Sequence, residues 1–600
     1  IIGHVLDKKT KEHLPYITIA LKGTTIGTVT DATGHYFLKN LPEGNFILEV
    51  SSVGYKTVTR NVTLKKGKTL EEDFEIEEDA IALDGVVVSA NRSETTRRLA
   101  PTLVNVVDLK LFETTNSSTL SQGLNFQPGV RVETNCQNCG FQQVRINGLD
   151  GPYTQILIDS RPVFSALSGV YGLEQIPASM IERVEVMRGG GSALFGSSAI
   201  AGTINIITKE PLRNSGQLSH TITSLGGSSS FDNNTSLNAS LVTDDHRAGL
   251  YIFGQNRHRS GYDYDGDGFT ELPKLKNQTV GFRSYLKTST YSKLTFEYHH
   301  MQEFRRGGDM LDRPPHEAHI AEQLQHSIDG GSLKFDYFSP DEKNRLSIFA
   351  SAANTDRDSY YGPGNDPLKA YGKTTDLTAM GGAQYVHTFD KCFFMPSDLT
   401  AGLEYNRDRL KDNMWGYDRH TDQTVNIYSA FLQNEWKNDR WGILIGGRLD
   451  KHNMVDNIIF SPRANLRFNP TQNINLRLSY SSGFRAPQAF DEDMHIENVG
   501  GTVAMIERAK NLKEKSQSFS ASADMYHRFG VFQTNFLIEG FYTRLTDVFV
   551  LGEPYDRGDG ILVKTRSNGP GAKVMGLTLE GKVAYLSILQ IQAGLTLQRS

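Results

Sequence analysis

The chain has 600 residues with 63 lysines and arginines against 68 aspartates and glutamates, and its net charge of −5 gives no basic excess that would favour a nucleic-acid partner. No apolar run is long enough for a spanning helix, which excludes an α-helical membrane protein but not a large β-barrel, whose alternating strands carry a weak hydropathy signal. The three cysteines allow one disulfide at most.

Residues 1–79 are predicted to form a compact β-sandwich. Short alternating runs, such as 16–21 and 45–50, are separated by glycine turns. The sequences at 23–31 and 34–37 resemble those of the carboxypeptidase-regulatory-like domain. No zinc-peptidase motif accompanies them, so we do not expect a peptidase.

A linker at 80–96 contains a short β-branched segment. The segment consists of Asp84, Gly85, Val86, Val87, Val88, Ser89 and Ala90. An extended segment flanked by polar sequence suits capture by strand addition to a partner protein, with backbone hydrogen bonds joining the two. A plain edge strand or linker is the alternative interpretation.

The most informative run is IERVEVMRG at 181–189, which leads into a glycine- and alanine-rich stretch ending at Thr208. Upstream, VRING at 144–148 and ILIDSR at 156–161 complete three ordered motifs. Together they resemble the plug domain of TonB-dependent outer-membrane receptors of the Bacteroidetes type, which carry an N-terminal carboxypeptidase-regulatory-like domain.

This resemblance implies a mainly β protein in which an α/β plug at 97–209 lies inside a large antiparallel transmembrane barrel of 22 strands. It also makes the segment 84–90 a TonB box. From 210 to 600, alternating segments such as 474–480 fit strands that turn apolar side chains to lipid and polar ones to the lumen. This stretch is short for 22 strands, so we expect C-terminal strands to be missing from the sequence.

A loop with two cysteines follows the first plug strands. It contains Cys136, Gln137, Asn138 and Cys139, and we expect it to face the ligand on the extracellular side of the plug. A disulfide between Cys136 and Cys139 is the favoured interpretation, because it suits an oxidising compartment. Metal capture by the two thiolates and a redox-active pair are the alternatives.

Carboxylates alternate in the loop at 263–268. Asp263, Asp265 and Asp267 occupy the first, third and fifth positions, with a glycine at the sixth, which is a spacing that suits calcium. The twelfth position holds a lysine rather than the closing glutamate, and Glu271 at the ninth is a partial substitute. A solvated acidic turn is the alternative.

Two further sets of residues have candidate roles. Three histidines, His316, His319 and His326, are candidate haem ligands, although such residues more often form hydrogen bonds in loops. Three plug arginines are expected to lock the plug to the barrel through buried ion pairs: Arg145, Arg161 and Arg183.

The resemblance implies an active transporter rather than an enzyme, located in the outer membrane of a Gram-negative bacterium with its N-terminal domain in the periplasm. The expected cargo is a ferric siderophore, with cobalamin or haem as alternatives and a surface adhesin as the alternative class. The expected partners are the TonB–ExbB–ExbD complex, outer-membrane lipid and a surface lipoprotein. No cofactor is required, and calcium in an extracellular loop is the one candidate.

Overall fold

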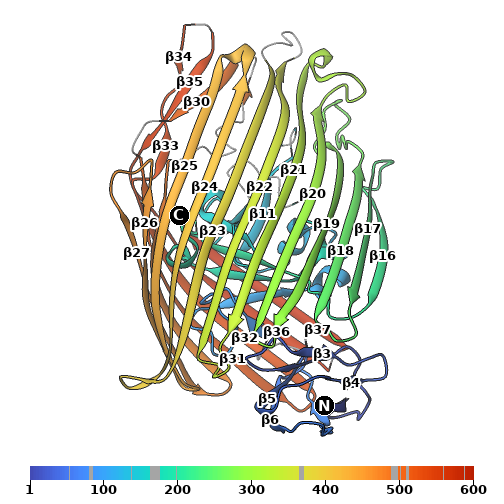
Figure 1. The fold of residues 1–600 in the computed structure, drawn as a ribbon. Coiled ribbons are helices and arrows are strands. Elements are labelled where there is room, and N and C mark those ends of the chain that lie inside the picture. The colour runs from blue at the N-terminus through green and yellow to red at the C-terminus, as the bar shows by residue number, and fades with distance from the viewer. Residues whose placement is uncertain are drawn as a thin grey trace.

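The computed structural model describes the chain except residues 53, 80–84, 137, 139, 163–173, 175, 198, 364–369, 488–496, 500–501, 509–511, 559 and 587. It contains a small N-terminal domain, a plug and a large barrel that surrounds the plug (Figure 1). None of the helices in the described part has the length and apolar character needed to cross a lipid bilayer.

The N-terminal domain is the predicted β-sandwich. One sheet has the order β4-β1-β7, and the other has the order β3-β2-β5-β6. Alternate side chains of both sheets meet in one core, which includes Val5, Ile19, Leu48 and Phe74. The strands are β1 (Ile2–Asp7), β2 (Thr18–Leu21), β3 (Gly27–Val29), β4 (His35–Phe37), β5 (Gly44–Ser51), β6 (Val58–Leu64) and β7 (Phe74–Ile76).

The plug is built on a four-stranded sheet of order β10-β14-β15-β13, with a separate β11–β12 hairpin. Its central strand β14 (Ile181–Arg188) is the predicted IERVEVMR strand and is buried along most of its length. The other elements are β8 (Val86–Val87), β9 (Thr95–Thr96), β10 (Val104–Asp108), α1 (Leu109–Thr114), α2 (Leu120–Leu124), β11 (Val130–Cys136), β12 (Phe141–Ile146), η1 (Gly151–Tyr153), β13 (Thr154–Ile158), η2 (Ala178–Met180), α4 (Ser192–Phe195) and β15 (Gly202–Thr208).

The barrel wall is a single antiparallel sheet of 17 strands in the described chain, against the 22 that the resemblance implies. In sheet order these are β16 (Ser215–Ser224), β17 (Phe231–Val242), β18 (Ala248–Arg259), β19 (Lys274–Ser289), β20 (Ser292–Gly308), β21 (Ile320–Phe338), β22 (Asn344–Pro363), β23 (Tyr371–Cys392), β24 (Met395–Met414), β25 (Arg419–Lys437), β26 (Trp441–His452), β27 (Ile459–Thr471), β28 (Ile474–Arg485), β31 (Glu514–Phe529), β32 (Phe532–Thr546), β36 (Ala572–Tyr585) and β37 (Leu589–Arg599).

Short elements lie outside this wall. A second sheet joins β29 (Glu497–Val499), β30 (Thr502–Arg508), β33 (Phe549–Leu551), β34 (Tyr555–Asp556) and β35 (Leu562–Asn568). The 3-10 turns η3 (Pro315–Glu317) and η4 (Trp415–Tyr417) lie between wall strands.

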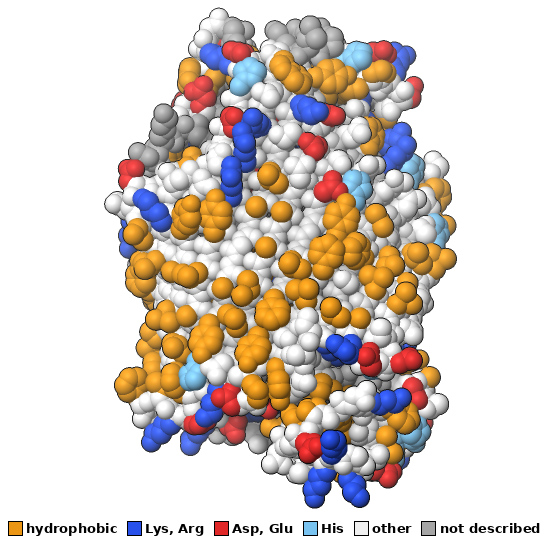
Figure 2. All heavy atoms as spheres, viewed as in Figure 1, with side chains coloured by type: hydrophobic (Ala, Val, Ile, Leu, Met, Phe, Trp, Pro, Cys, Tyr) orange, Lys and Arg blue, Asp and Glu red, His pale blue; other side chains and the backbone are white. Residues whose placement is uncertain are grey.

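The predicted alternation places apolar side chains outside and polar ones inside. On β28, Leu476 and Leu478 are exposed, whereas Asn475 and Arg477 are buried against the plug side. Figure 2 shows hydrophobic side chains in a belt across the visible face of the wall, with most charged side chains toward its two ends. This distribution is expected for a barrel that meets lipid around its middle.

The N-terminal domain sits against the turns at one end of the barrel (Figure 1). Thr25 donates its backbone N–H to the carbonyl of Thr290 at 2.8 Å, and the Thr28 hydroxyl lies 3.1 Å from Nε2 of His246. The turn that contains His246 joins β17 to β18. Loops at the other ends of these strands therefore lie at the far mouth of the barrel.

Candidate functional site

The segment 85–90 is packed against the plug rather than free. β8 forms a two-residue antiparallel ladder with β9. Val87 and Ala90 are fully buried and contact Ala100 and Val104 in a small apolar cluster. Asp84, the first residue of the predicted segment, lies outside the described residues.

One buried carboxylate holds this segment on the plug sheet. Oε2 of Glu185 accepts three hydrogen bonds, from the backbone N–H of Val88 at 2.9 Å, from that of Ser89 at 2.8 Å and from the Ser89 hydroxyl at 2.7 Å. Arg183 donates to the other oxygen at 3.0 Å, and Asn205 donates to the Ser89 hydroxyl at 3.0 Å. Hydrogen bonds to an ionised acceptor are stronger than neutral ones, so this cluster is a firm attachment.

We call this arrangement the Glu185 clamp: Glu185 with the donors of Val88 and Ser89. It occupies the backbone N–H groups of two consecutive residues, and strand addition to a partner would need one of them, because consecutive N–H groups of an extended strand point to opposite sides. The segment must therefore leave Glu185 before those groups can pair with another chain. Sequence reasoning missed the clamp, although a lone glutamate between Val184 and Val186 on a buried strand is a signal for it.

The chain that follows the clamp is fastened to the barrel wall. Asn91 donates to Glu435 at 2.7 Å, and Arg92 is paired with Glu404. Arg463 donates to the carbonyl of Ala90 at 3.0 Å. These contacts fix one end of the segment, so its release has to begin on the side of residue 85.

A buried arginine at the end of β14 joins the plug to the barrel. Arg188 lies 3.0 Å from the carboxylate of Glu539 on β32 and 2.6 Å from that of Glu580 on β36. All three side chains are at most 3% exposed. Removing one partner of such a buried pair leaves an uncompensated charge, which makes the contact a strong constraint on plug movement.

A second connection reaches other strands of the wall. Glu174 of the plug lies 2.7 Å from Arg305, 3.2 Å from Arg259 and 3.4 Å from Arg257. Burial alone would raise the pKa of Glu174, but the three guanidinium groups hold it well below its usual range. The carboxylate is therefore ionised at neutral pH and ties β18 and β20 to the plug.

Two of the three arginines predicted to lock the plug do something else. Arg145 pairs with Glu133 at 2.5 Å and with Asp150 at 2.8 Å, both within the plug. Arg183 also pairs within the plug, with Glu182 and Glu185. Among the described residues, the ion-pair partners of both arginines lie on the plug rather than on the barrel, because acidic side chains close by on the plug reach them.

Arg161 does meet the barrel, through a ring, and the barrel carboxylates Glu297 and Asp336 also attract it electrostatically. Its guanidinium lies 4.8 Å from the ring centroid of Phe349 on β22. The side chain is buried. It therefore contributes a cation–π contact between plug and wall.

The predicted ligand-facing loop touches the wall at β20. A side chain at Gly307 would collide with the carbonyl of Asn138, and Arg305 donates to the carbonyl of Gly140 at 3.3 Å. β11 ends at Cys136. Gln137, Cys139 and the predicted disulfide lie outside the described residues, so the disulfide stays a prediction.

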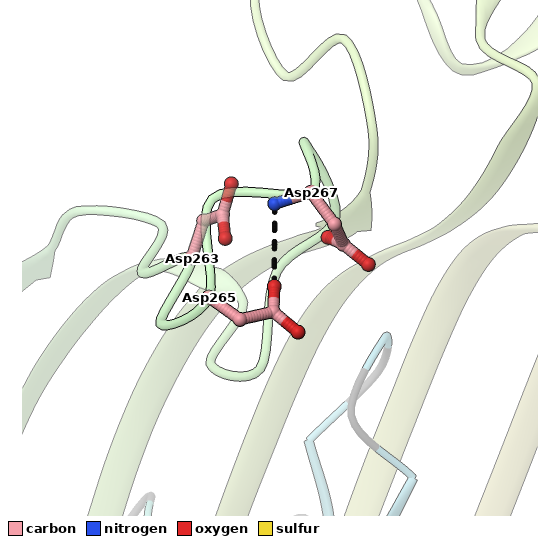
Figure 3. A group of neighbouring side chains, drawn as sticks. All are labelled: Asp263, Asp265 and Asp267. Atoms are coloured by element: carbon pink, nitrogen blue, oxygen red, sulfur yellow. Dashed lines mark hydrogen bonds between the residues drawn. The ribbon is translucent and has the colours of Figure 1, made fainter.

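The three aspartates predicted to bind calcium lie together in the loop between β18 and β19 (Figure 3). One carboxylate oxygen from each of Asp263, Asp265 and Asp267 lies within 4.8 Å of the others. Asp263 accepts the backbone N–H groups of Gly266 and Gly268 at 2.7 and 2.9 Å. Glu271 accepts the N–H of Tyr264 instead of joining the group. The oxygen-rich set suits a hard cation such as Ca²⁺, and calcium binding stays a prediction.

The predicted haem histidines each have a different neighbour. His316 hydrogen-bonds the hydroxyl of Tyr371 at 2.9 Å, and His319 lies 2.6 Å from Asp309. His326 is buried 3.7 Å from Glu303. The three histidines thus have separate polar neighbours, and haem ligation stays a prediction.

Comparison with known proteins assigns a family model to each part of the chain. Residues 1–88 match the CarboxypepD_reg-like domain, residues 96–203 the TonB-dependent receptor plug domain, and residues 202–600 the TonB dependent receptor-like β-barrel. Two curated relatives are vitamin B12 transporters named BtuB from Vibrio vulnificus. The protein of strain CMCP6 is 25% identical over 424 residues, which is 68% of this chain and 64% of that protein. The protein of strain YJ016 is 29% identical over 237 residues, which is 35% of this chain and 39% of that protein.

Solved structures show the same fold at low identity. The siderophore receptor PirA of Pseudomonas aeruginosa has a TM-score of 0.67 at 17% identity, covering 83% of this chain and 85% of that one. The ferric enterobactin receptor PfeA of the same organism, as a double mutant, has a TM-score of 0.69 at 18% identity, covering 84% and 80%.

Proposed function

The chain belongs to the TonB-dependent receptor family, and from this premise we propose that it is an outer-membrane receptor that imports a scarce metal chelate, a ferric siderophore, with energy supplied through TonB. The observation that carries the proposal is the Glu185 clamp. It keeps an extended β-branched segment in store on the plug, with its pairing groups covered until the segment is released.

The clamp and the plug–barrel ion pairs lie on one strand. Glu185 and Arg188 are three residues apart on β14, so a pull on Val88 and Ser89 loads the strand that Arg188 fastens to the barrel. Hydrogen-bonded strands transmit such a load along their length. A partner that grips the segment therefore acts on the centre of the plug sheet.

Cargo binding at the far mouth and segment release at the near end are two coupled sites. Coupling requires that cargo bind the released and the stored forms with different affinities. The loop at Asn138 and Gly140, which touches β20, gives the plug a contact surface on the cargo side. The TonB–ExbB–ExbD complex supplies the force in this scheme, and no enzymatic step is needed.

The test is uptake of labelled iron from ferric siderophores by iron-starved cells with and without the gene. The expected result is that deletion abolishes uptake of one siderophore and that the wild-type gene on a plasmid restores it. Unchanged uptake for a broad panel of siderophores would reject the siderophore as cargo.

Cobalamin is the second candidate cargo. It is supported by the sequence similarity to vitamin B12 transporters and by the aspartate group of the β18–β19 loop, which offers a calcium-type site at the cargo mouth. Labelled cobalamin added to the same two strains distinguishes the cargoes. If neither cargo depends on the gene, a surface receptor that does not transport becomes the better interpretation.

A further inference from the structure

Three histidines of the N-terminal domain come together on one edge of β1. His4 on β1 and His35 on β4 are direct partners in the antiparallel register, so their side chains leave the sheet on the same face. The segment around His13 then pairs with the same strand, through a bridge from His13 to Leu6. The pairing of β4 with β1 and the pairing of the His13 segment with β1 meet at Gly34.

Gly34 makes room for this meeting. Its φ of +79° is in the left-handed region, and a β-carbon there would lie 2.8 Å from Cβ of His13. With no side chain at this point, the ring of His13 lies between the other two. Its centroid is 5.0 Å from that of His4 and 4.9 Å from that of His35, and those two are 5.8 Å apart.

These spacings match the rings of a three-histidine metal site. A ring nitrogen binds Zn²⁺ at about 2.0–2.1 Å, which puts the ring centroid about 3.2 Å from the ion and three tetrahedrally arranged centroids about 5.2 Å apart. The rings are therefore at the right separation. Among the described residues, only the aspartate group at 263–267 has ligand atoms that all lie within 4.8 Å of one another. The nitrogens of the three histidines are not yet this close together, so the rings still have to turn toward a common point. His13 is exposed and its ring makes no hydrogen bond among the described residues, which leaves it free to turn.

The neighbours of His35 fix which of its nitrogens is available. The Thr33 hydroxyl lies 2.6 Å from Asp31 Oδ1 and 3.0 Å from Nδ1 of His35. The same Asp31 oxygen also accepts the backbone N–H groups of Thr33 at 2.8 Å and of His35 at 3.1 Å, so this carboxylate is the acceptor in all of these contacts. The single hydroxyl proton of Thr33 then goes to Asp31, and Nδ1 of His35 must be the donor. Its Nε2 keeps the lone pair that a metal requires.

His4 is oriented in the same way. Its Nδ1 lies 3.0 Å from Oδ1 of Asp73, an oxygen that also accepts the backbone N–H of His4 at 3.1 Å. A carboxylate beside Nδ1 favours the tautomer with the proton on that nitrogen and leaves Nε2 as a ligand. Histidines that bind metals usually have their second nitrogen held by a carboxylate, carbonyl or similar partner.

We propose that His4, His13 and His35 bind one divalent transition-metal ion of the Zn²⁺ class, with Asp31 and Asp73 as charge-compensating outer partners. Imidazole nitrogen is a preferred ligand of Zn²⁺, Cu²⁺ and Ni²⁺. With three protein ligands, a fourth position stays open to water or to an incoming ligand. The ion would join β1, β4 and the segment around His13, and it is independent of the cargo proposed above.

The test is equilibrium dialysis of the full chain in detergent against Zn²⁺, with the bound metal counted. We expect His13→Gln and His35→Gln each to lose one bound ion, whereas His220→Gln, which alters an exposed histidine of β16, loses none. Thr33→Val, which removes the orienting hydroxyl but no ligand, should weaken binding about 10- to 100-fold. Co²⁺ bound in place of Zn²⁺ should give the intense visible absorption of a four-coordinate site in the wild type and in His220→Gln, but not in His13→Gln or His35→Gln.

Equal zinc stoichiometry and affinity in the wild type, His13→Gln and Thr33→Val would overturn the proposal. So would a Co²⁺ spectrum that does not differ between the wild type and His35→Gln. His13 and His35 are exposed, so their substitution leaves the core of the domain intact.

Discussion

Replacing Glu185 by glutamine should release the segment 85–90 from the plug. The amide keeps one oxygen for Val88 and Ser89, but that oxygen is neutral. Its NH₂ group would then face Nε of Arg183, a donor that has lost this acceptor and keeps only the contact of its guanidinium with Glu182. The substitution hardly changes the volume of the side chain, so the packing of β14 is preserved.

The magnitude follows from the three hydrogen bonds. Bonds to a charged acceptor contribute about 1.5–3 kcal/mol each and neutral ones about 0.5–1.5 kcal/mol, so the loss is about 1 kcal/mol per bond and about 3 kcal/mol for the clamp. Since about 1.4 kcal/mol corresponds to a factor of ten, the released fraction should rise about 100-fold.

Hydrogen exchange of the peptide that contains Val88 and Ser89 measures this directly. Their amides should exchange about 100-fold faster in Glu185→Gln, because both N–H groups bond to the altered oxygen. The matched control is Glu182→Gln, a residue of the same strand that pairs with Arg183 but does not touch the segment. Equal exchange in the wild type and both variants would refute the clamp.

Three other predictions follow from the same contacts. Glu174→Gln should destabilise the plug–barrel assembly by about 3–5 kcal/mol near neutral pH, because it leaves three guanidinium groups without their shared carboxylate. The pKa of Glu174 is depressed, so its contribution to the stability of the folded protein is complete above the pH range where free glutamates titrate and is lost as the pH falls below that range. The thermal unfolding temperatures of wild type and variant should therefore converge only in strong acid. Convergence near pH 7 would contradict this prediction. Val87→Pro should abolish transport while cargo binding persists, because proline removes a backbone N–H that strand pairing needs. The control Val87→Ala keeps this N–H and should transport. Uptake retained in the proline variant would show that strand pairing at residue 87 is not needed. Asp265→Asn should weaken Ca²⁺ binding measured by calorimetry, and a wild-type chain that takes up no Ca²⁺ would leave the loop a solvated acidic turn.

The sequence was sufficient for features that repeat or that recur as motifs. Alternation along 474–480 predicted the inward Asn475 and Arg477 and the outward Leu476 and Leu478, because the side-chain period of a strand is two. The IERVEVMRG run predicted the central plug strand. In both cases the signal is local, so a single chain carries it.

Contacts between distant segments were not predictable in this way. The clamp joins Val88 to Glu185, 97 positions apart, and depends on how the linker crosses the plug sheet. Arg183 and Arg188 look alike in the sequence, yet the first meets a plug carboxylate and the second meets barrel carboxylates. The difference is set by which face and which end of β14 each occupies. The histidine group likewise depends on the register that pairs His4 with His35.

A photo-crosslinking amino acid placed at position 87, in cells that take up cargo, tests directly whether TonB grips this segment. We expect a crosslink to TonB that increases when cargo is added and when Glu185 is replaced by glutamine. The same amino acid at Leu120, buried in the plug core, should give none. Uptake that depends on TonB without any crosslink from position 87 would contradict the claim that this segment is the one TonB grips.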